Sequence, residues 1–358
     1  MRSARGLALL LSSALCVLVA EGALRLAWSN PYAGETDYLV RLRRHYGDKQ
    51  RVYDRSAIDP AHPRVALATD ARGYLRGAAR GDGPPDPTAL RIAFLGGSTT
   101  ECTALDAEVR FPALVEAGLR ARGIPAVAWN AAVSGNNLHD SLHVLLDHVV
   151  ADAPDVVLVM HATNDTGVLA TADGYASSMG VPLDARVAVR WLETVASRSS
   201  FVVAFARHRL AAYALVPQPL AADVAARETG PGAAAIPVAP FARRLRAFVG
   251  VARAFDIEPV LATQPLAATQ NALTPAWANV GAQARFNEAT RAVGAETGAL
   301  VVDLDAAVRA SGADWDAPMH LFYDGMHVTA EGSRLYARTI VDSLAPRLRA
   351  RHRSREEP

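Results

Sequence analysis

Apolar and polar residues alternate along most of the chain in blocks that predict strands and helices in turn. Short, nearly uninterrupted apolar runs predict buried strands at residues 90–95, 125–133, 155–160, 259–263 and 300–304. Apolar residues at helical spacing predict helices at residues 107–122, 138–150, 241–255, 282–297 and 329–348. Strands that alternate with helices form a mainly parallel sheet covered on both faces, so we expect an α/β fold.

Two segments interrupt this rhythm. Residues 29–88 are polar, rich in Pro and Gly and weakly periodic, and we expect an irregular connecting arm there. The α/β domain should then cover residues 89–350, followed by a polar tail at 351–358. Within the domain, residues 166–240 form a long Ala-rich insertion after a strand end, where an insertion usually makes a lid over the site.

The first 28 residues have the pattern of an export signal. Arg2 and Arg5 precede an apolar run over residues 7–20, which is the length of a signal peptide and shorter than the ~20 residues of a full membrane span. If the helix continues to Trp28, the segment can stay as an uncleaved anchor with the indole at the membrane surface. We favour the anchor, with the rest of the chain on the periplasmic or extracellular side; cleavage is the alternative.

Charge and cysteine content narrow the possible functions. The 37 Lys and Arg residues nearly balance the 36 Asp and Glu residues, so no basic surface predicts a nucleic-acid partner. Cys16 and Cys102 are the two cysteines of the 358 residues, and Cys16 lies in the apolar run. A disulfide framework is therefore excluded, and the domain must rely on its core. We expect Cys102 to be a small packing residue rather than a nucleophile.

Polar clusters follow the strands at positions where their side chains would meet. In an open parallel sheet, ligands bind at the carboxyl ends of the strands. Residues 96–99 follow the first strand, 134–137 the second and 161–165 the third, and residues 323–327 come after the last strand and a loop. We expect these four clusters to converge.

The clusters contain the groups that nucleophilic catalysis requires. The Ser98 hydroxyl needs a base to take its proton, and His327, oriented by Asp324 three residues earlier, can supply it. The backbone N–H groups of Ser98 and Gly135 and the side-chain amide of Asn164 can hold a developing oxyanion. Each group alone has an ordinary structural explanation, such as a helix cap for Ser98. Their order at four strand ends favours the catalytic interpretation.

This arrangement closely resembles the SGNH hydrolase superfamily, also called GDSL-type esterases and lipases. Its blocks are a Ser after the first strand, a Gly after the second, an Asn after the third and Asp-x-x-His near the C-terminus, matched here by Ser98, Gly135, Asn164, Asp324 and His327. The resemblance implies a flavodoxin-like three-layer α/β/α sandwich, no metal or other cofactor, and ester hydrolysis or acyl transfer through an acyl-enzyme.

The match departs from the family pattern in two places. Gly97 and Thr99 flank Ser98 where the name-giving block has Asp and Leu, and Ala162 replaces a Gly of the third block. The first block, Gly-Gly-Ser-Thr-Thr-Glu at residues 96–101, is similar to that of membrane-anchored SGNH proteins. Thr99 to Glu101 are expected to cap the first turn of a helix, with contact to substrate as the alternative.

Histidines near the site raise the question of a metal. His161 could pair with His139 or Asp140, but no second ligand pair stands at a strand end, so we expect none. His139, His143 and Asp147 recur at a spacing of four, which we interpret as the polar face of one helix.

With the family resemblance, these patterns lead us to expect an exported, membrane-tethered esterase. The expected location and the resemblance imply a small acyl ester as its substrate, such as an O-acetyl group on an envelope glycan. Two alternatives remain open. The same site can transfer the acyl group to a glycan hydroxyl instead of water, or the fold can serve as a catalytically silent scaffold or glycan-binding module.

Overall fold

The computed structural model describes residues 2–28, 30, 50–56, 58–75, 77, 88–171, 174–177, 196, 199–212, 236–267, 280–312 and 320–356. The chain divides into two compact units. The first comprises Met1–Arg41 and Met179–Ala226, and the second comprises Leu42–Ser178 and Arg227–Pro358.

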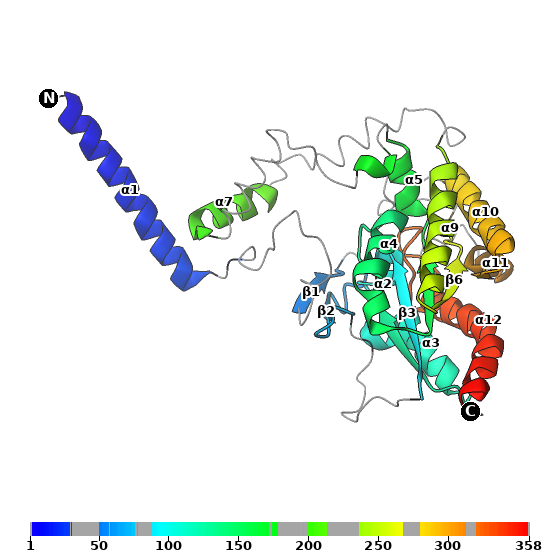
Figure 1. Cartoon of the computed structure of the whole chain (residues 1–358). Helices are drawn as coiled ribbons and strands as arrows, with labels where there is room; N and C mark the ends of the chain where they lie inside the picture. Colours follow the sequence, from blue (N-terminus) through cyan, green and yellow to red (C-terminus); the bar gives the residue numbers. More distant parts are fainter. Residues whose placement is uncertain are drawn as a thin grey trace. The chain divides into compact units, whose positions relative to one another are not determined.

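A five-stranded parallel sheet forms the centre of the second unit (Figure 1). Its strands are β3 (Leu90–Gly96), β4 (Ala126–Asn130), β5 (Val156–Met160), β6 (Glu258–Ala262) and β7 (Leu300–Val302). They lie in the order β4-β3-β5-β6-β7, and every neighbouring pair is parallel. This is the flavodoxin-like order. The chain first adds β4 on one side of β3 and then adds β5, β6 and β7 on the other side. The predicted α/β fold and all five predicted strands are confirmed.

Helices cover both faces of this sheet. One face carries α3 (Phe111–Arg120), α11 (Leu304–Ala310) and α12 (Ala330–Glu356), and the other carries α4 (Leu138–Asp147), α9 (Ala239–Ala254) and α10 (Val280–Thr297). Successive strand residues point to opposite faces. Ile92 and Phe94 therefore pack under α3 and α12, whereas Ala93 and Leu95 pack under α4 and α9.

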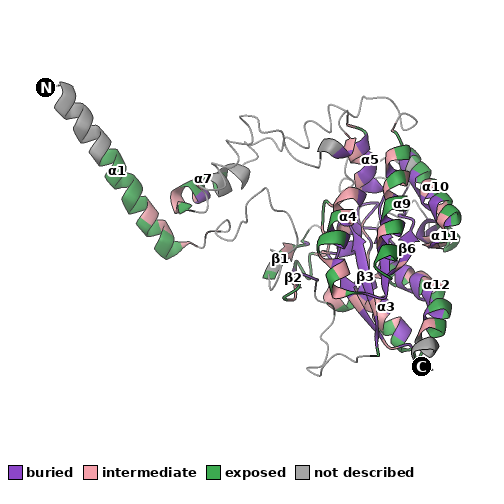
Figure 2. Ribbon diagram, in the orientation of Figure 1, coloured by how far each residue is buried: buried purple, intermediate pink, exposed green. Residues whose placement is uncertain are grey.

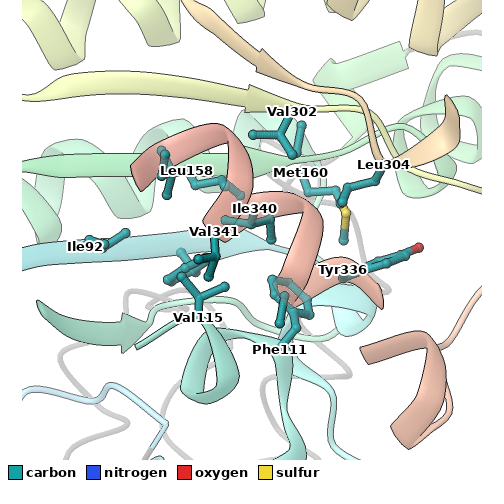
Figure 3. Close-up of a cluster of buried hydrophobic side chains, with 14 of the residues drawn as sticks. Ile92, Phe111, Val115, Leu158, Met160, Val302, Leu304, Tyr336, Ile340 and Val341 are labelled. Carbon is teal, nitrogen blue, oxygen red and sulfur yellow. The ribbon is translucent and has the colours of Figure 1, made fainter. Parts of the chain in front are cut away.

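The sheet is the most buried part of the domain (Figure 2). Figure 3 shows the core on the α12 side, where Ile340 and Val341 of α12 lie over Ile92 and Leu158 of the sheet. Every one of these side chains except Val341, at 3%, is no more than 1% exposed. Such a core holds the strand ends, and the groups that follow them, in fixed positions.

Short elements lie between the larger ones. They are the helices α2 (Ser98–Glu101) and α5 (Thr163–Leu169) and the 3-10 turns η2 (Ala107–Val109), η3 (Val149–Asp152) and η4 (Gly174–Ser177). Helices α2 and α5 begin at the ends of β3 and β5, so their first residues lie at the carboxyl edge of the sheet.

The expectation of an irregular arm at residues 29–88 is wrong for part of that segment. Strands β1 (Gln50–Asp54) and β2 (Arg64–Ala68) pair antiparallel. Val65 and Leu67 alternate with exposed residues and bury one face of β2 against Leu75. An alternation of buried and exposed residues predicts a strand. In β2 the alternating segment is short and has prolines and charged residues around it, so the pattern is hard to recognise in the sequence. Residues 351–356, expected within a polar tail, continue α12.

The first unit contains α1 (Arg2–Ala27) and α7 (Phe201–Ala212), which pack on each other. The Glu21 carboxylate of α1 accepts hydrogen bonds from the backbone N–H groups of Phe201 and Val202 and from the Ser200 hydroxyl. The Trp28 ring meets Phe201 edge-on. Glu21 therefore caps the N-terminus of α7, whose first N–H groups have no acceptor within their own helix.

The structure does not support the expected membrane helix, and it describes little of the expected lid. Among the described residues, no helix combines the length and apolarity that crossing a membrane requires, so the predicted membrane helix is not supported. Most of the expected lid at residues 166–240 lies outside the described residues, and the lid stays a prediction.

Candidate active site

The structure brings Ser98, Asp324 and His327 into one hydrogen-bonded chain. Ser98 is the first residue of α2, directly beyond β3, and its Oγ lies 2.7 Å from His327 Nε2. His327 Nδ1 lies 2.5 Å from Asp324 Oδ2. Asp324 Oδ1 also accepts hydrogen bonds from the backbone N–H groups of Met326 and His327. One buried carboxylate thus fixes both the imidazole and the loop that carries it.

The two glycines before Ser98 allow other groups to approach closely. A Cβ at Gly96 would lie 2.1 Å from Thr100 Oγ1, and a Cβ at Gly97 would lie 2.7 Å from Asn164 Nδ2 and 2.9 Å from Asn136 O. No side chain fits at these distances. The glycines therefore let the loop after β4 and the amide of Asn164 lie against the turn that presents Ser98.

The three predicted oxyanion groups belong to this same turn and the loops beside it. Asn164 Nδ2 donates to Asn136 O at 2.7 Å, which ties the amide to the residue after Gly135. Gly135 has φ +86°, a left-handed conformation that favours glycine. No described residue accepts a hydrogen bond from the backbone N–H of Ser98 or of Gly135. These N–H groups, and the second amide hydrogen of Asn164, are available to a ligand.

Sequence reasoning missed the role of Glu101. Its Oε2 accepts hydrogen bonds from the Ser134 N–H at 2.6 Å and from the Ser134 hydroxyl at 2.5 Å. Glu101 was expected to cap the first helical turn or to contact substrate. Instead its side chain is buried and holds the loop that carries Gly135.

Gln264 was also missed. Its Nε2 donates to Thr99 Oγ1 at 3.2 Å, and its Oε1 accepts from the Thr163 N–H at 3.0 Å. Gln264 thus connects the residue after Ser98 with the residue before Asn164. Gln264 stands two residues beyond the end of β6. Ligands bind at the carboxyl ends of the strands in such a sheet, and a search of the residues after β6 would therefore have identified Gln264 as a candidate.

A small hollow of mixed polar and apolar lining opens beside Ser98 and His327. The hollow is shallow and open to solvent, and it is too small to enclose a water molecule. Cys102, Ala104, Leu105 and Val328 form the apolar part of its lining, and the polar part comes from Ser98, Thr99, Tyr323 and His327. Burial raises the pKa of the Cys102 thiol to about 12, so the thiol stays protonated at neutral pH. Cys102 therefore lines the hollow as a small apolar residue.

A second Ser–His–Asp set lies behind the site and is buried. Ser141 Oγ lies 2.7 Å from His161 Nε2, and His161 Nδ1 lies 3.6 Å from Asp165 Oδ2. Burial lowers the pKa of His161 to about 3 and raises the pKa of Asp165 to about 7. All three are at most 3% exposed, so no substrate reaches them. Asp165 Oδ1 accepts from the Leu138 N–H and the Tyr175 hydroxyl, which links α5 to the start of α4.

The two histidines of α4 lie on one face of the helix, where His139 is half-buried and His143 is exposed. His139 Nε2 and His143 Nε2 are 3.2 Å apart, and Arg244 Nε donates to His139 Nδ1. Burial, His143 and Arg244 lower the pKa of His139 to about 4. A guanidinium beside the pair opposes a cation, and the described residues contain no group of three or more His, Cys, Asp or Glu that could hold a metal.

Comparison with known proteins identifies the family of the chain. The model of the GDSL-like Lipase/Acylhydrolase family matches residues 94–335, more than half of the chain. No curated protein matches the chain.

Three of the solved structures to which the chain is similar are all of low sequence identity. The acetyl xylan esterase AlAXEase is 15% identical, with 71% of this chain and 100% of that chain covered and a TM-score of 0.45. The lipase/acylhydrolase from Enterococcus faecalis is 18% identical, with 72% and 96% covered and a TM-score of 0.46. Axe2, an acetylxylan esterase from Geobacillus stearothermophilus, is 16% identical, with 71% and 94% covered and a TM-score of 0.45.

Proposed function

Because the chain belongs to the GDSL-like lipase/acylhydrolase family and is a serine hydrolase, we propose that it hydrolyses a small acyl ester, such as an O-acetyl ester, through an acyl-enzyme on Ser98. The observation that carries this proposal is the hydrogen-bonded chain from Ser98 Oγ to His327 Nε2, at 2.7 Å, and from His327 Nδ1 to Asp324 Oδ2, at 2.5 Å. A bound base with a fixed tautomer is what a serine hydroxyl needs to become a nucleophile.

The reaction follows from these positions. Asp324 holds the proton of His327 on Nδ1, so Nε2 accepts the proton of Ser98 as Oγ attacks the ester carbonyl. The carbonyl oxygen becomes negative and is held by the N–H groups of Ser98 and Gly135 and by the amide of Asn164. Nε2 then gives its proton to the departing alcohol oxygen. A water molecule, deprotonated by His327, then attacks the acyl-enzyme. His327 returns that proton to Ser98 Oγ as the bond from Oγ to the acyl carbon breaks and the acid is released.

The hollow beside Ser98 supports a short acyl group as the substrate's reacting part. The small size of the hollow favours a short acyl group over a long chain. Cys102, Ala104, Leu105 and Val328 supply the apolar part of a lining that also contains Ser98, Thr99, Tyr323 and His327. We therefore propose that the acyl chain occupies the hollow and that the alcohol extends toward solvent.

Turnover of p-nitrophenyl acetate tests the assignment. Ser98→Ala should abolish turnover and labelling by a fluorophosphonate probe, and labelling that persists in Ser98→Ala would overturn the role of Ser98. Analysis of products formed with an acetyl donor and a glycan acceptor separates hydrolysis from transfer. Failure of the wild-type chain to react with any activated ester would favour the silent scaffold.

We also propose that α1 directs the chain out of the cytoplasm and keeps it at the membrane, with the hydrolase domain on the periplasmic or extracellular side. Arg2, Arg5 and the apolar run that follows support this location. The resemblance of the first block, Gly-Gly-Ser-Thr-Thr-Glu, to that of membrane-anchored SGNH proteins favours the same location. Fractionation of cells that express the full chain, with and without residues 1–28, tests it. Equal distribution of the two forms would contradict both export and attachment.

A further inference from the structure

The wall of the acyl hollow is a loop without regular structure that begins at the nucleophile turn. The Cys102 N–H donates to Ser98 O at 2.9 Å, and Cys102 has φ +55°, a left-handed conformation that turns the chain away from α2. The Leu105 N–H then donates to Cys102 O. Ala104 and Leu105 line the hollow from this loop, and both are buried. The size of the hollow therefore depends on what holds residues 102–106 in place.

Two arginine side chains hold the carbonyl groups of this loop. Arg110 Nε donates to Leu105 O at 3.1 Å. Arg55 NH1 donates to Ala104 O at 3.1 Å and to Asp106 Oδ2 at 3.2 Å. The Arg55 side chain is 9% exposed. A planar guanidinium that binds a carbonyl and a carboxylate together fixes both acceptors in direction as well as distance.

Arg55 comes from a different part of the chain than the loop. It follows β1 directly, and the β1–β2 hairpin positions it, because its backbone N–H donates to Pro63 O and its Nε donates to His62 O at 2.6 Å. The hairpin precedes residues 94–335, the part of the chain that matches the family model. A segment outside the matched region thus contacts the wall of the acyl hollow.

We propose that Arg55 is a positioning residue that sets the depth of the acyl hollow, so that the β1–β2 hairpin determines how long an acyl chain the enzyme accepts. The substrate class is esters of acetyl-sized acyl groups. This inference rests on the proposed function. Without Arg55, the carbonyl of Ala104 loses its donor and the loop can move away from Ser98, which makes room for longer chains.

The ratio of kcat/KM for p-nitrophenyl acetate to that for p-nitrophenyl butyrate measures this effect in the full chain. One methylene that a pocket admits or rejects changes kcat/KM by roughly 10- to 200-fold. We expect wild type to prefer acetate and Arg55→Ala to lower the ratio by about tenfold or more. Arg55→Lys keeps the positive charge but replaces the several N–H donors of the planar guanidinium with one ammonium group. Arg55→Lys should therefore lower the ratio less than Arg55→Ala does.

Arg120→Ala is the matched control. Arg120 Nε donates to Ala126 O at 2.8 Å, and Arg120 NH2 pairs with Glu116 at 3.2 Å. Arg120 therefore binds one backbone carbonyl and one carboxylate, as Arg55 does, but away from the active site. The control should lose stability and keep the wild-type ratio. A general loss of stability would lower the rates with both esters and leave their ratio unchanged.

The outcomes separate this inference from the proposed function. An unchanged ratio in Arg55→Ala, with turnover that still depends on Ser98, would overturn the role of Arg55 alone. Turnover that does not depend on Ser98 would overturn both. If Arg55→Ala fails to fold, Arg55→Lys decides: a ratio equal to that of wild type would overturn the proposal, and a lowered ratio supports it.

Discussion

Glu101 Oε2 accepts hydrogen bonds from both the backbone N–H and the hydroxyl of Ser134, at 2.6 and 2.5 Å. Glu101 lies three residues after Ser98, and Ser134 directly precedes Gly135. Glu101 is 4% exposed. Its carboxylate therefore connects the turn that carries Ser98 to the loop that carries Gly135, an oxyanion donor. The distance between attacking oxygen and oxyanion donor depends on this link.

Glu101→Ala should lower kcat much more than it raises KM. An oxyanion donor contributes about 3 to 4 kcal/mol to the transition state and little to substrate binding, so a displaced Gly135 N–H should cost roughly 100-fold in kcat. Glu101→Gln keeps an oxygen that can accept the Ser134 N–H and should recover most of the rate. Steady-state kinetics with p-nitrophenyl acetate measure both variants.

Glu116→Ala provides the control for this prediction. Glu116 Oε2 accepts the backbone N–H of Ala128 in β4 at 2.7 Å, so it makes the same kind of bond in a part of the sheet that carries no catalytic group. Its loss should lower the free energy of unfolding by about 1 to 3 kcal/mol and leave kcat unchanged. If Glu101→Ala behaved like Glu116→Ala, the carboxylate would have only a structural role.

Alanine at Gly97 and at Gly135 should have different effects. A Cβ at Gly97 would collide with Asn164 Nδ2 at 2.7 Å and Asn136 O at 2.9 Å, so Gly97→Ala must displace the oxyanion amide and should lower kcat by about 100-fold or more. A Cβ at Gly135 meets no atom within 4 Å, but φ is +86°, so Gly135→Ala should cost about 1 to 2 kcal/mol in stability.

Kinetics and thermal unfolding of the two variants distinguish these mechanisms. Gly97→Ala should be impaired mainly in kcat, and Gly135→Ala mainly in melting temperature. The assignment of Asn164 as an oxyanion donor would be contradicted by a Gly97→Ala variant with wild-type kcat.

The sheet could be predicted from the sequence because its signal is local. Buried parallel strands such as β5, whose five residues are all buried, appear as uninterrupted apolar runs. The strand-end rule then placed Ser98, Asn164 and His327 at one edge without any knowledge of distances, and the structure brings them together.

The supporting contacts could not be predicted in this way, because they join residues far apart in the sequence. Gln264 and Thr99 are 165 positions apart, and Arg55 and Ala104 are 49 apart. Nothing in the local pattern around Glu101 distinguishes an acid that caps its own helix from one that holds another loop. Such roles depend on side-chain geometry, which only the folded structure gives.

Gln264→Ala should lower stability more than Thr99→Val does. Gln264 Oε1 accepts the buried Thr163 N–H, and its removal leaves that donor without its acceptor, at a cost of about 1 to 3 kcal/mol. Thr99→Val removes only the 3.2 Å bond to Gln264 Nε2. Chemical denaturation of both variants measures the difference. Equal loss of stability would mean that the bond to Thr163 contributes little.

The free energy of unfolding should depend on pH through Asp165. Burial raises the pKa of this carboxyl from 3.8 to about 7, with Asp140 adding to the rise and the hydrogen bonds from Tyr175 and Leu138 opposing it. Between these two values the unfolded chain has lost the proton and the folded chain keeps it. The folded state then binds more protons, so this group lowers stability as pH rises from about 4 to 7.

Asp165→Asn removes that dependence and keeps the contacts. The Asn Oδ1 can accept from the Leu138 N–H and the Tyr175 hydroxyl as Asp165 Oδ1 does. The stability of the variant relative to wild type should therefore increase with pH between about 4 and 7, by an amount on the order of a few kcal/mol, and stay level above. Urea unfolding of both chains across this range measures the difference.

His161 does not disturb this comparison. Burial lowers its pKa from 6.5 to about 3, so it stays neutral in the folded chain and lowers stability as pH falls below 6.5, the opposite direction to Asp165. Both chains contain His161, so its contribution cancels in the difference between them. A difference in stability that stays constant from pH 4 to 8 would show that Asp165 is ionised in the folded chain, despite its burial beside His161.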